Sequence, residues 1–141
     1  MVLHLGKEVR VISPDLDIML MPTELSRVAG MFGRMLPGTF GRSVVVDGLT
    51  VDFIAATRGW ERALVQKAIR LQGIPTIPMI GLIALKFGSG HDKDLNDLLK
   101  IYLANPKLLE EARPLIKLAF SNEVEDYDST VMLIKHLASI K

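Results

Sequence analysis

The feature that most constrains the fold of this sequence is an Asp-Gly pair set between two runs rich in β-branched residues. Asp47 and Gly48 separate residues 43–46 from residues 49–54. A two-residue turn of type I′ needs a positive φ at both central positions, and Asp-Gly is one of the pairs that adopt it most readily. The sequence therefore predicts a β-hairpin, and the fold must contain an antiparallel pair of strands.

Further strands and helices are expected on both sides of the hairpin. Residues 9–12, 16–21 and 74–77 are apolar and extended in character, while a proline and two glycines in residues 37–41 predict a flexible break. Apolar spacings of three and four residues predict helices over 24–36, 60–72, 78–87, 92–103, 105–120 and 128–140. We expect Asp92 or Asp94 to cap the fourth helix, Asp128 or Ser129 to cap the last, and Gly73 to end the second in a left-handed conformation.

Alternating strand-like and helix-like segments, followed by a helical last third, predict an α/β (α+β) fold. This pattern favours a mixed β-sheet with flanking helices over a helical bundle or a β-sandwich. A length of 141 residues suits one domain. We expect a single domain over residues 1–141, with a sheet-containing core in 1–87 and an all-helical part in 88–141.

Composition narrows the classes of protein to which the chain can belong. It has no cysteine and a net charge of +1, which argues against a disulfide scaffold, a thiolate zinc site and a nucleic-acid-coating protein. No signal-peptide pattern opens the sequence, and the longest apolar run, residues 74–85, is broken by prolines and too short to span a bilayer. We expect a soluble, cytoplasmic protein. Its mean hydropathy of +0.30 predicts a homo-oligomer contact or a surface for a partner protein.

Two aspartates stand at the start of an expected strand. Asp15 and Asp17 are two residues apart, so both carboxylates would project from the same face of the strand. Like charges this close repel one another unless a cation lies between them. Such oxygen ligands suit Mg²⁺ or Mn²⁺. The alternative is a polar start of a strand that faces water.

Asp52 adds a third acid in the second strand of the hairpin, between Val51 and Phe53. An apolar strand offers little reason for a carboxylate, and a buried one needs a cation or a hydrogen-bond donor. If this strand pairs with the strand of Asp15 and Asp17, three acids converge and can hold metal ions for phosphoryl transfer. The alternative is an edge strand on which Asp52 faces solvent.

Three motifs, in this order, resemble the minimal and AbiEii-like members of the nucleotidyltransferase superfamily. The first is the run R-V-I-S-P-D-L-D at residues 10–17, and Asp52 in V-D-F-I is similar to the third acid of the family. The third motif is L-I-A-L-K-F at residues 82–87, followed by H-D-K-D-L-N-D-L at residues 91–98. The resemblance covers residues 9–100 and implies a nucleotidyltransferase-like mixed sheet.

The resemblance also implies an activity and a role for each matched residue. Asp15, Asp17 and Asp52 would be catalytic and would ligate Mg²⁺ or Mn²⁺. Ser13, Lys86, Lys93 and Asp94 would contact the nucleotide. The reaction would move a nucleoside monophosphate from a nucleoside triphosphate to a hydroxyl of a protein, an RNA end or a small molecule. Many members of the superfamily belong to toxin–antitoxin modules, so a partner protein is expected.

The sequence departs from the family at one motif. Members carry a Gly-Gly or Gly-Ser pair upstream of the first acids, whereas the residues before Asp15 contain Gly6 and no such pair. Either the start is truncated, or the triphosphate is held differently, or transfer activity has been lost. The alternative function is therefore a catalytically degenerate subunit of the same fold that binds or regulates a partner, with a contact surface on its helical C-terminal part.

Overall fold

A computed structural model describes residues 2–3, 11–12, 15–32, 36–38, 41–90 and 92–140. Side-chain surroundings are described for residues 16–31, 43–90 and 94–140. The described backbone forms two compact units, one within residues 2–3, 11–12, 15–32, 36–38 and 41–66 and the other within residues 67–90 and 92–140. Strands lie mainly in the first unit and helices mainly in the second, which confirms the α+β class and the helical C-terminal part.

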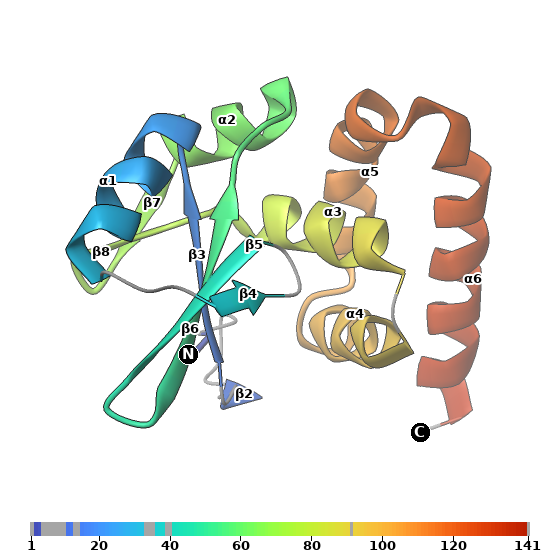
Figure 1. Cartoon of the computed structure of the whole chain (residues 1–141). Coiled ribbons are helices and arrows are strands. Elements are labelled where there is room, and N and C mark those ends of the chain that lie inside the picture. Colours follow the sequence, from blue (N-terminus) through green and yellow to red (C-terminus); the bar gives the residue numbers. More distant parts are fainter. Residues whose placement is uncertain are drawn as a thin grey trace. The chain divides into compact units, whose positions relative to one another are not determined.

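A four-stranded sheet forms the centre of the first unit (Figure 1). The strands lie side by side in the order β3-β6-β5-β4, so β6 occupies an interior position. A separate two-stranded sheet pairs β1 (Val2–Leu3) with β2 (Val11–Ile12). The four strands of the main sheet are β3 (Asp15–Leu20), β4 (Leu36–Gly38), β5 (Gly41–Val46) and β6 (Leu49–Ala55).

The predicted hairpin is confirmed. β5 and β6 are antiparallel, with Val46 opposite Leu49, and the turn between them is Asp47-Gly48. Asp47 has φ 50° and Gly48 has φ 81°, the two positive values that a type I′ turn requires. Only glycine adopts the second of these without steric cost, so Gly48 sets the reversal of the chain.

The parallel pairing of β3 with β6 is the relationship on which the expected acid cluster depended. β3 is followed by helix α1 (Pro22–Phe32) and by the strands β4 and β5, and the chain then returns along β3 as β6. The register places Asp17 opposite Asp52 and Leu20 opposite Ala55. The crossover therefore brings residues that are far apart in the sequence to the same row of the sheet.

Two predicted boundaries in this unit are wrong. The helix expected over residues 24–36 is described as α1 and ends at Phe32, and Leu36, expected on its apolar face, begins β4. The flexible break expected over residues 37–41 contains the rest of that strand, whose Pro37 lies opposite Arg42. β4 is an edge strand, where proline is tolerated because one side of the strand needs no hydrogen-bond donor.

The helix expected over residues 60–72 also ends early. Helix α2 (Gly59–Gln66) closes the first unit, and the amide of Arg58 donates to the buried Glu61 carboxylate at its start. Residues 69–71, expected to continue this helix, instead form β7 (Ile69–Leu71), which pairs with β8 (Ile74–Thr76) in the second unit. Gly73 has the expected positive φ of 79°, but it lies in the β7–β8 turn rather than at a helix end.

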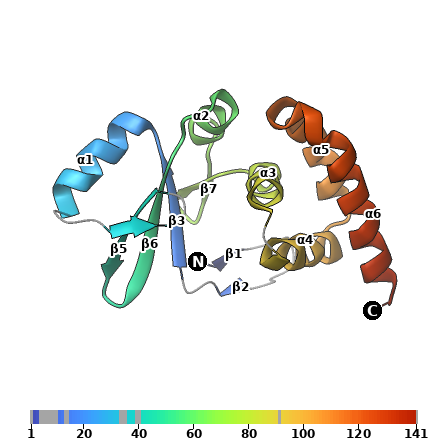
Figure 2. The same cartoon turned by 45° about the vertical axis from the view of Figure 1, so that its right-hand side comes forward.

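Four α-helices make up most of the second unit (Figure 2). The first follows Pro78, runs two residues beyond its expected end at residue 87 and is followed by Gly90 in the left-handed conformation. The last begins at Val124, four residues before the expected cap Asp128, directly after a single 3-10 turn, η1 (Ser121–Glu123). The helices are α3 (Met79–Ser89), α4 (Asp92–Ala104), α5 (Lys107–Ala119) and α6 (Val124–Ile140).

The core of the second unit comes from all four helices. Its largest fully buried side chains are Ile83, Leu109, Ile116, Tyr127 and Ile134. Tyr127 donates its hydroxyl to the carbonyl of Leu109 at 2.5 Å and meets the ring of Phe87 edge to face at 5.2 Å. Among the described helices, none combines the length and the apolar character that crossing a membrane requires.

Candidate functional site

Two of the three expected acids face each other across the sheet of the first unit. Asp17 of β3 and Asp52 of β6 are register partners, and partners on neighbouring strands project to the same face about 4.8 Å apart at the backbone. Asp17 is exposed and Asp52 is half-buried. Two carboxylates in directly opposed positions repel each other, which favours a cation beside them.

Ser43 extends this row to a third strand. It is the register partner of Asp52 on β5, and its hydroxyl donates a hydrogen bond to the Asp52 carboxylate. The contact fixes one oxygen of Asp52 and leaves the other oxygen available for a further ligand. Ser43, Asp52 and Asp17 therefore form a continuous polar row across three neighbouring strands.

The interior position of β6 removes the alternative interpretation of Asp52. An edge-strand aspartate facing solvent was one explanation of this residue, but β6 is hydrogen-bonded to β3 on one side and to β5 on the other. Its neighbours Val51 and Phe53 are buried on the opposite face, with exposed fractions of 7% and 4%. Asp52 thus lies on the polar face of a central strand.

The remaining residues of the expected metal site are only partly described. Asp15 is the first residue of β3 and lies opposite Thr50, two positions along the strand from Asp17, while its side chain lies outside the described residues. Ser13 lies outside them altogether. Among the side chains that the structure describes, no three from His, Cys, Asp and Glu are grouped closely enough to hold a metal ion.

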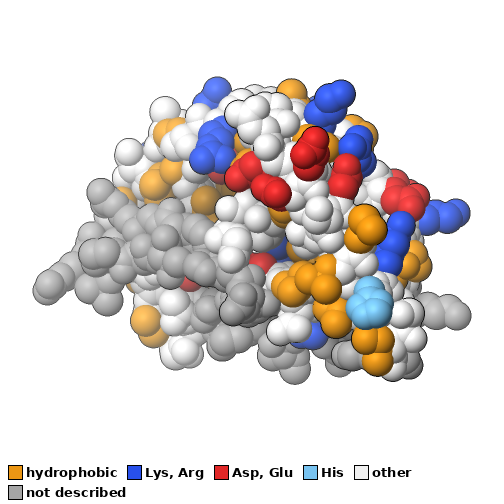
Figure 3. Space-filling model, turned by 90° about the vertical axis from the view of Figure 1, so that its right-hand side faces the viewer, with side chains coloured by type: hydrophobic (Ala, Val, Ile, Leu, Met, Phe, Trp, Pro, Cys, Tyr) orange, Lys and Arg blue, Asp and Glu red, His pale blue; other side chains and the backbone are white. Residues whose placement is uncertain are grey.

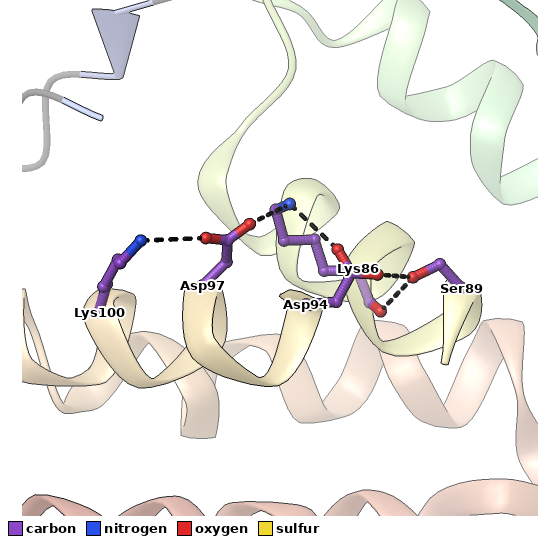
Figure 4. A network of polar contacts seen from close by, with 5 residues as sticks. All are labelled: Lys86, Ser89, Asp94, Asp97 and Lys100. Carbon is purple, nitrogen blue, oxygen red and sulfur yellow. Dashed lines mark hydrogen bonds and ion pairs between the residues drawn. The ribbon is translucent and has the colours of Figure 1, made fainter. Parts of the chain in front are cut away.

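The second group of expected residues lies on the α3–α4 hairpin of the second unit. Lys86, in the last turn of α3, donates to Asp94 Oδ1 at 3.2 Å and to Asp97 Oδ2 at 2.7 Å (Figure 4). The hydroxyl of Ser89 donates to the second oxygen of Asp94, and Lys100 lies 3.5 Å from the second oxygen of Asp97. Helical spacing places Asp94, Asp97 and Lys100 on one face of α4, three residues apart.

The charges of this network are mutually stabilising. Burial works to lower the pKa of Lys86, but hydrogen bonds and charge from Asp97 and Asp94 outweigh it, so that pKa lies above its ordinary value. Burial works to raise the pKa of Asp97, but Lys86 and Lys100 outweigh it and hold that pKa below its usual range. Lys86 and Asp97 are therefore both ionised at neutral pH, and their positive and negative charges balance.

These contacts clarify the roles expected of Lys86 and Asp94. The side chain of Lys86 is 20% exposed and two of its three donors are used, which leaves one N–H for a phosphate oxygen. Asp94 is only 6% exposed and both its oxygens accept hydrogen bonds within the protein. Asp94 therefore fixes the position of the Lys86 ammonium group in this structure. Lys93 lies in α4, and its side chain is outside the described residues.

Sequence reasoning missed the contributions of Ser43, Asp97 and Ser89. Ser43 could have been found from the hairpin itself, because the Asp47-Gly48 turn fixes the register and makes residues 43 and 52 opposite partners. Asp97 stands three residues after Asp94, the spacing of one helix face, within the motif that carried the resemblance. Nothing local in the sequence indicates that Ser89 reaches Asp94.

Each group has a definite chemical capacity. The row of Asp17, Asp52 and Ser43 offers hard oxygen ligands of the kind preferred by Mg²⁺ and Mn²⁺. The α3–α4 network offers one partly exposed ammonium group at a fixed position.

No family model matches the sequence, and no curated protein sequence is similar enough to count as a relative.

Proposed function

We propose that this protein is a metal-dependent nucleotidyltransferase that transfers a nucleoside monophosphate from a nucleoside triphosphate to a hydroxyl acceptor. The observation that carries the proposal is the register that sets Asp17 directly opposite Asp52 in parallel strands. The two acids are separated by a helix and two strands in the sequence, so their alignment depends on the fold. The same alignment is what the resemblance to the nucleotidyltransferase superfamily requires.

The residues of the row fit a hard divalent cation. Asp17 and Asp52, with Asp15 at the start of the same strand, would ligate Mg²⁺ or Mn²⁺, and Ser43 would keep the Asp52 carboxylate in orientation. When bound, the metal would neutralise charge on the transferred phosphoryl group and orient the attacking oxygen. Asp52 would complete the metal site or act as the base for the acceptor hydroxyl.

The nucleotide contacts in this proposal come from the resemblance. Lys86 would contact phosphate oxygens through its one remaining N–H, with Asp94 and Asp97 holding it in place. Ser13 and Lys93 would complete the binding of the nucleotide. The acceptor would be a protein, an RNA end or a small molecule, and the setting would be a cytoplasmic toxin–antitoxin pair or a homo-oligomer.

A catalytically degenerate binding subunit is the second candidate. It is favoured by one observation: the positive charge of Lys86 is already balanced by Asp94 and Asp97, so a phosphate must compete for it. In that case the polar row would bind a divalent ion or a nucleotide without transfer. Release of pyrophosphate distinguishes the two candidates, because only an enzyme produces it.

The test is the thermal stability of the protein with Mg²⁺ and each of the four nucleoside triphosphates. A ligand at about 100 times its dissociation constant stabilises the native state by about 2.7 kcal/mol, which corresponds to a rise in Tm of about 5–10 °C for a domain of this size. We expect such a rise with at least one triphosphate, and only when Mg²⁺ is present. Asp17→Asn and Asp52→Asn should each abolish it.

A matched control is available on the same hairpin. Asp47→Asn removes one carboxylate from the β5–β6 turn, and asparagine tolerates the positive φ of 50° found there. This variant should keep the full rise in Tm. The proposal fails if no triphosphate stabilises the protein with Mg²⁺, or if Asp47→Asn loses the effect as completely as Asp17→Asn.

A further inference from the structure

The carboxylate of Asp52 stands between two different neighbours in the polar row. Ser43 lies opposite Asp52 on β5 and Asp17 lies opposite it on β3, each about 4.8 Å away at the backbone. Register partners project to the same face of a sheet, so Asp52 is the middle side chain of the three. The contact that Asp52 makes on its β5 side therefore decides what it can offer on its β3 side.

Ser43 engages one of the two oxygens of this carboxylate. Its hydroxyl donates to Oδ1 of Asp52, and this hydrogen bond draws Oδ1 toward β5. With the residues that the structure describes, Oδ2 forms no hydrogen bond or ion pair. Because the two oxygens of a carboxylate point away from each other in one plane, Oδ2 is the oxygen left for the β3 side, where Asp17 lies.

The hairpin builds this orientation into the fold. The Asp47-Gly48 turn sets the register that makes Ser43 and Asp52 partners, and β6 is held on its other side by β3. The side chain of serine is short and turns about a single bond, so its hydroxyl stays close to β5. Ser43 and Asp52 are both half-buried, which limits competition from water. The carboxylate is thus oriented by the folded hairpin.

Mg²⁺ and Ca²⁺ make different demands on such a carboxylate. Mg²⁺ requires a nearly ideal octahedron of oxygens at about 2.0–2.1 Å, and the narrow angle between two oxygens of one carboxylate fits that octahedron poorly. Ca²⁺ accepts a larger and more flexible set of oxygens at about 2.3–2.6 Å and often takes both oxygens of one carboxylate. A single oxygen directed toward β3 therefore suits Mg²⁺ better than Ca²⁺.

We propose that Ser43 makes the polar row selective for Mg²⁺ over Ca²⁺ by keeping Asp52 a ligand with one oxygen. This inference rests on the proposed function, because it takes the row of Asp17 and Asp52 as the metal site. It adds which ion the row prefers and which residue decides the preference. Ser43 is a positioning residue here, since it acts through Asp52 and does not itself contact the ion.

Removal of the Ser43 hydroxyl should affect the two ions differently. In Ser43→Ala, Oδ1 of Asp52 is free to turn toward β3, so that Mg²⁺ loses an oriented ligand and Ca²⁺ gains a second oxygen. Loss of a group that orients a metal ligand typically changes affinity about 10–100-fold. We expect the ratio of the Ca²⁺ to the Mg²⁺ dissociation constant to fall about 10-fold or more. A serine that only stabilised the fold would weaken both ions equally and leave this ratio unchanged.

The experiment titrates the isotope-labelled full chain with MgCl₂ and, separately, with CaCl₂, without nucleotide and at constant ionic strength. Amide NMR spectra follow the backbone signals of Asp17 and Asp52 at ion concentrations of about 0.1 to 50 mM, a range that includes the affinities of weak carboxylate sites. The unchanged protein should bind Mg²⁺ more tightly than Ca²⁺. Ser43→Thr keeps the hydroxyl and should keep the ratio, whereas Asp52→Asn should remove the response to both ions.

Exposed acids away from the row supply an internal control. Glu123 in η1 and Glu125 and Asp126 in the first turn of α6 are exposed. Figure 3 views the side of the molecule on which α6 lies and shows acidic side chains gathered on it. Divalent ions screen such surface charges with little discrimination. The amides of these three residues should therefore respond alike to both ions, in the unchanged protein and in Ser43→Ala.

The possible results separate the role of Ser43 from the metal site itself. Tighter binding of Ca²⁺ than of Mg²⁺, or the same ratio in Ser43→Ala as in the unchanged protein, would overturn the role of Ser43 and leave the metal site standing. A change of ratio that appears equally at the amides of Glu125 and Asp126 would also overturn it. If neither ion shifts the amides of Asp17 and Asp52, both the role of Ser43 and the metal site are wrong.

Discussion

Gly88 and Phe120 are in such close contact that a Cβ atom at residue 88 would lie 2.6 Å from Cζ of the Phe120 ring. Gly88 is in the penultimate position of α3, and Phe120 directly follows α5. The ring is also held edge to face against Phe87 at 5.8 Å. The Phe120 ring therefore occupies the space that a side chain at residue 88 would need.

We predict that Gly88→Ala destabilises the protein. Alanine is favoured over glycine within a helix by about 1 kcal/mol, but displacing a packed aromatic ring costs about 1–3 kcal/mol. A net loss of up to about 2 kcal/mol in the free energy of unfolding should appear in urea titrations. Gly30→Ala in α1 is the control, since a Cβ there meets no atom within 4 Å and the substitution should stabilise.

The Lys86–Asp97 pair should show energetic coupling. Lys86→Met leaves the buried Asp94 carboxylate without its cation and should cost about 2–4 kcal/mol, while Asp97→Asn should cost about 1–2 kcal/mol. The double variant should lose less than the sum, with a coupling of about 1–2 kcal/mol in a double-mutant cycle. The exposed pair Arg113–Asp128 is the comparison, and its cycle should show weaker coupling. Strict additivity at Lys86 and Asp97 would contradict the network.

The Lys86–Asp97 pair predicts that stability falls at acid pH. The pKa of Asp97 is lowered in the folded state because Lys86 and Lys100 outweigh the effect of burial. Its stabilising contribution is therefore complete above the ordinary aspartate pKa of about 3.9 and is lost as pH falls through the lower folded value. Unfolding titrations between pH 2 and 6 should show a shallower acid loss for Asp97→Asn than for the unchanged protein.

The raised pKa of Tyr127 predicts that stability falls at alkaline pH. Burial and the charge of Asp128 raise the pKa of its hydroxyl, so the stabilisation is complete below the ordinary pKa of about 10 and is lost as pH rises above it. Tyr127→Phe removes the hydrogen bond to Leu109 and should cost about 1–2 kcal/mol at pH 7. The difference between the two proteins should narrow from pH 9 to 11.

Ser43 should matter for metal binding more than for folding. Its hydroxyl holds the Asp52 carboxylate, and groups that orient metal ligands typically change affinity about 10–100-fold. We expect Ser43→Ala to raise the Mg²⁺ concentration needed for nucleotide-dependent stabilisation by about 10-fold. Ser43→Thr keeps the hydroxyl and should restore most of the affinity. Equal metal requirements for Ser43→Ala and the unchanged protein would exclude this role.

The sequence predicted those parts of the fold that depend on the residue types of a few neighbouring positions. Asp47-Gly48 identified the hairpin, because a turn depends on a few neighbouring residues. β4 and β7 were missed for the opposite reason. Leu36 and Ile69 continue the spacing of the preceding helices, and only pairing with β5 and β8, respectively, makes their segments strands.

In the candidate site, too, the sequence indicated individual residues but not the pairs that they form. The sequence indicated Asp17 and Asp52 as exceptional residues in apolar strands, but only the parallel crossover aligns them. It indicated Lys86 as a charged residue at a helix end, but its partner Asp97 is eleven residues away on another helix. Side-chain pairs of this kind depend on the packing of whole elements, which periodicity within one element does not describe.

The hairpin between β5 and β6 also limits how this chain can vary in length. β6 is held in register by β3 on one side and β5 on the other, and side chains alternate between the two faces of a strand. One residue inserted into β6 before Asp52 would turn this carboxylate toward the face of Val51 and Phe53. Substitutions in the hairpin that keep Gly48 should therefore be tolerated more readily than insertions and deletions. Homologous chains that keep the acids should therefore differ there in composition far more than in residue count.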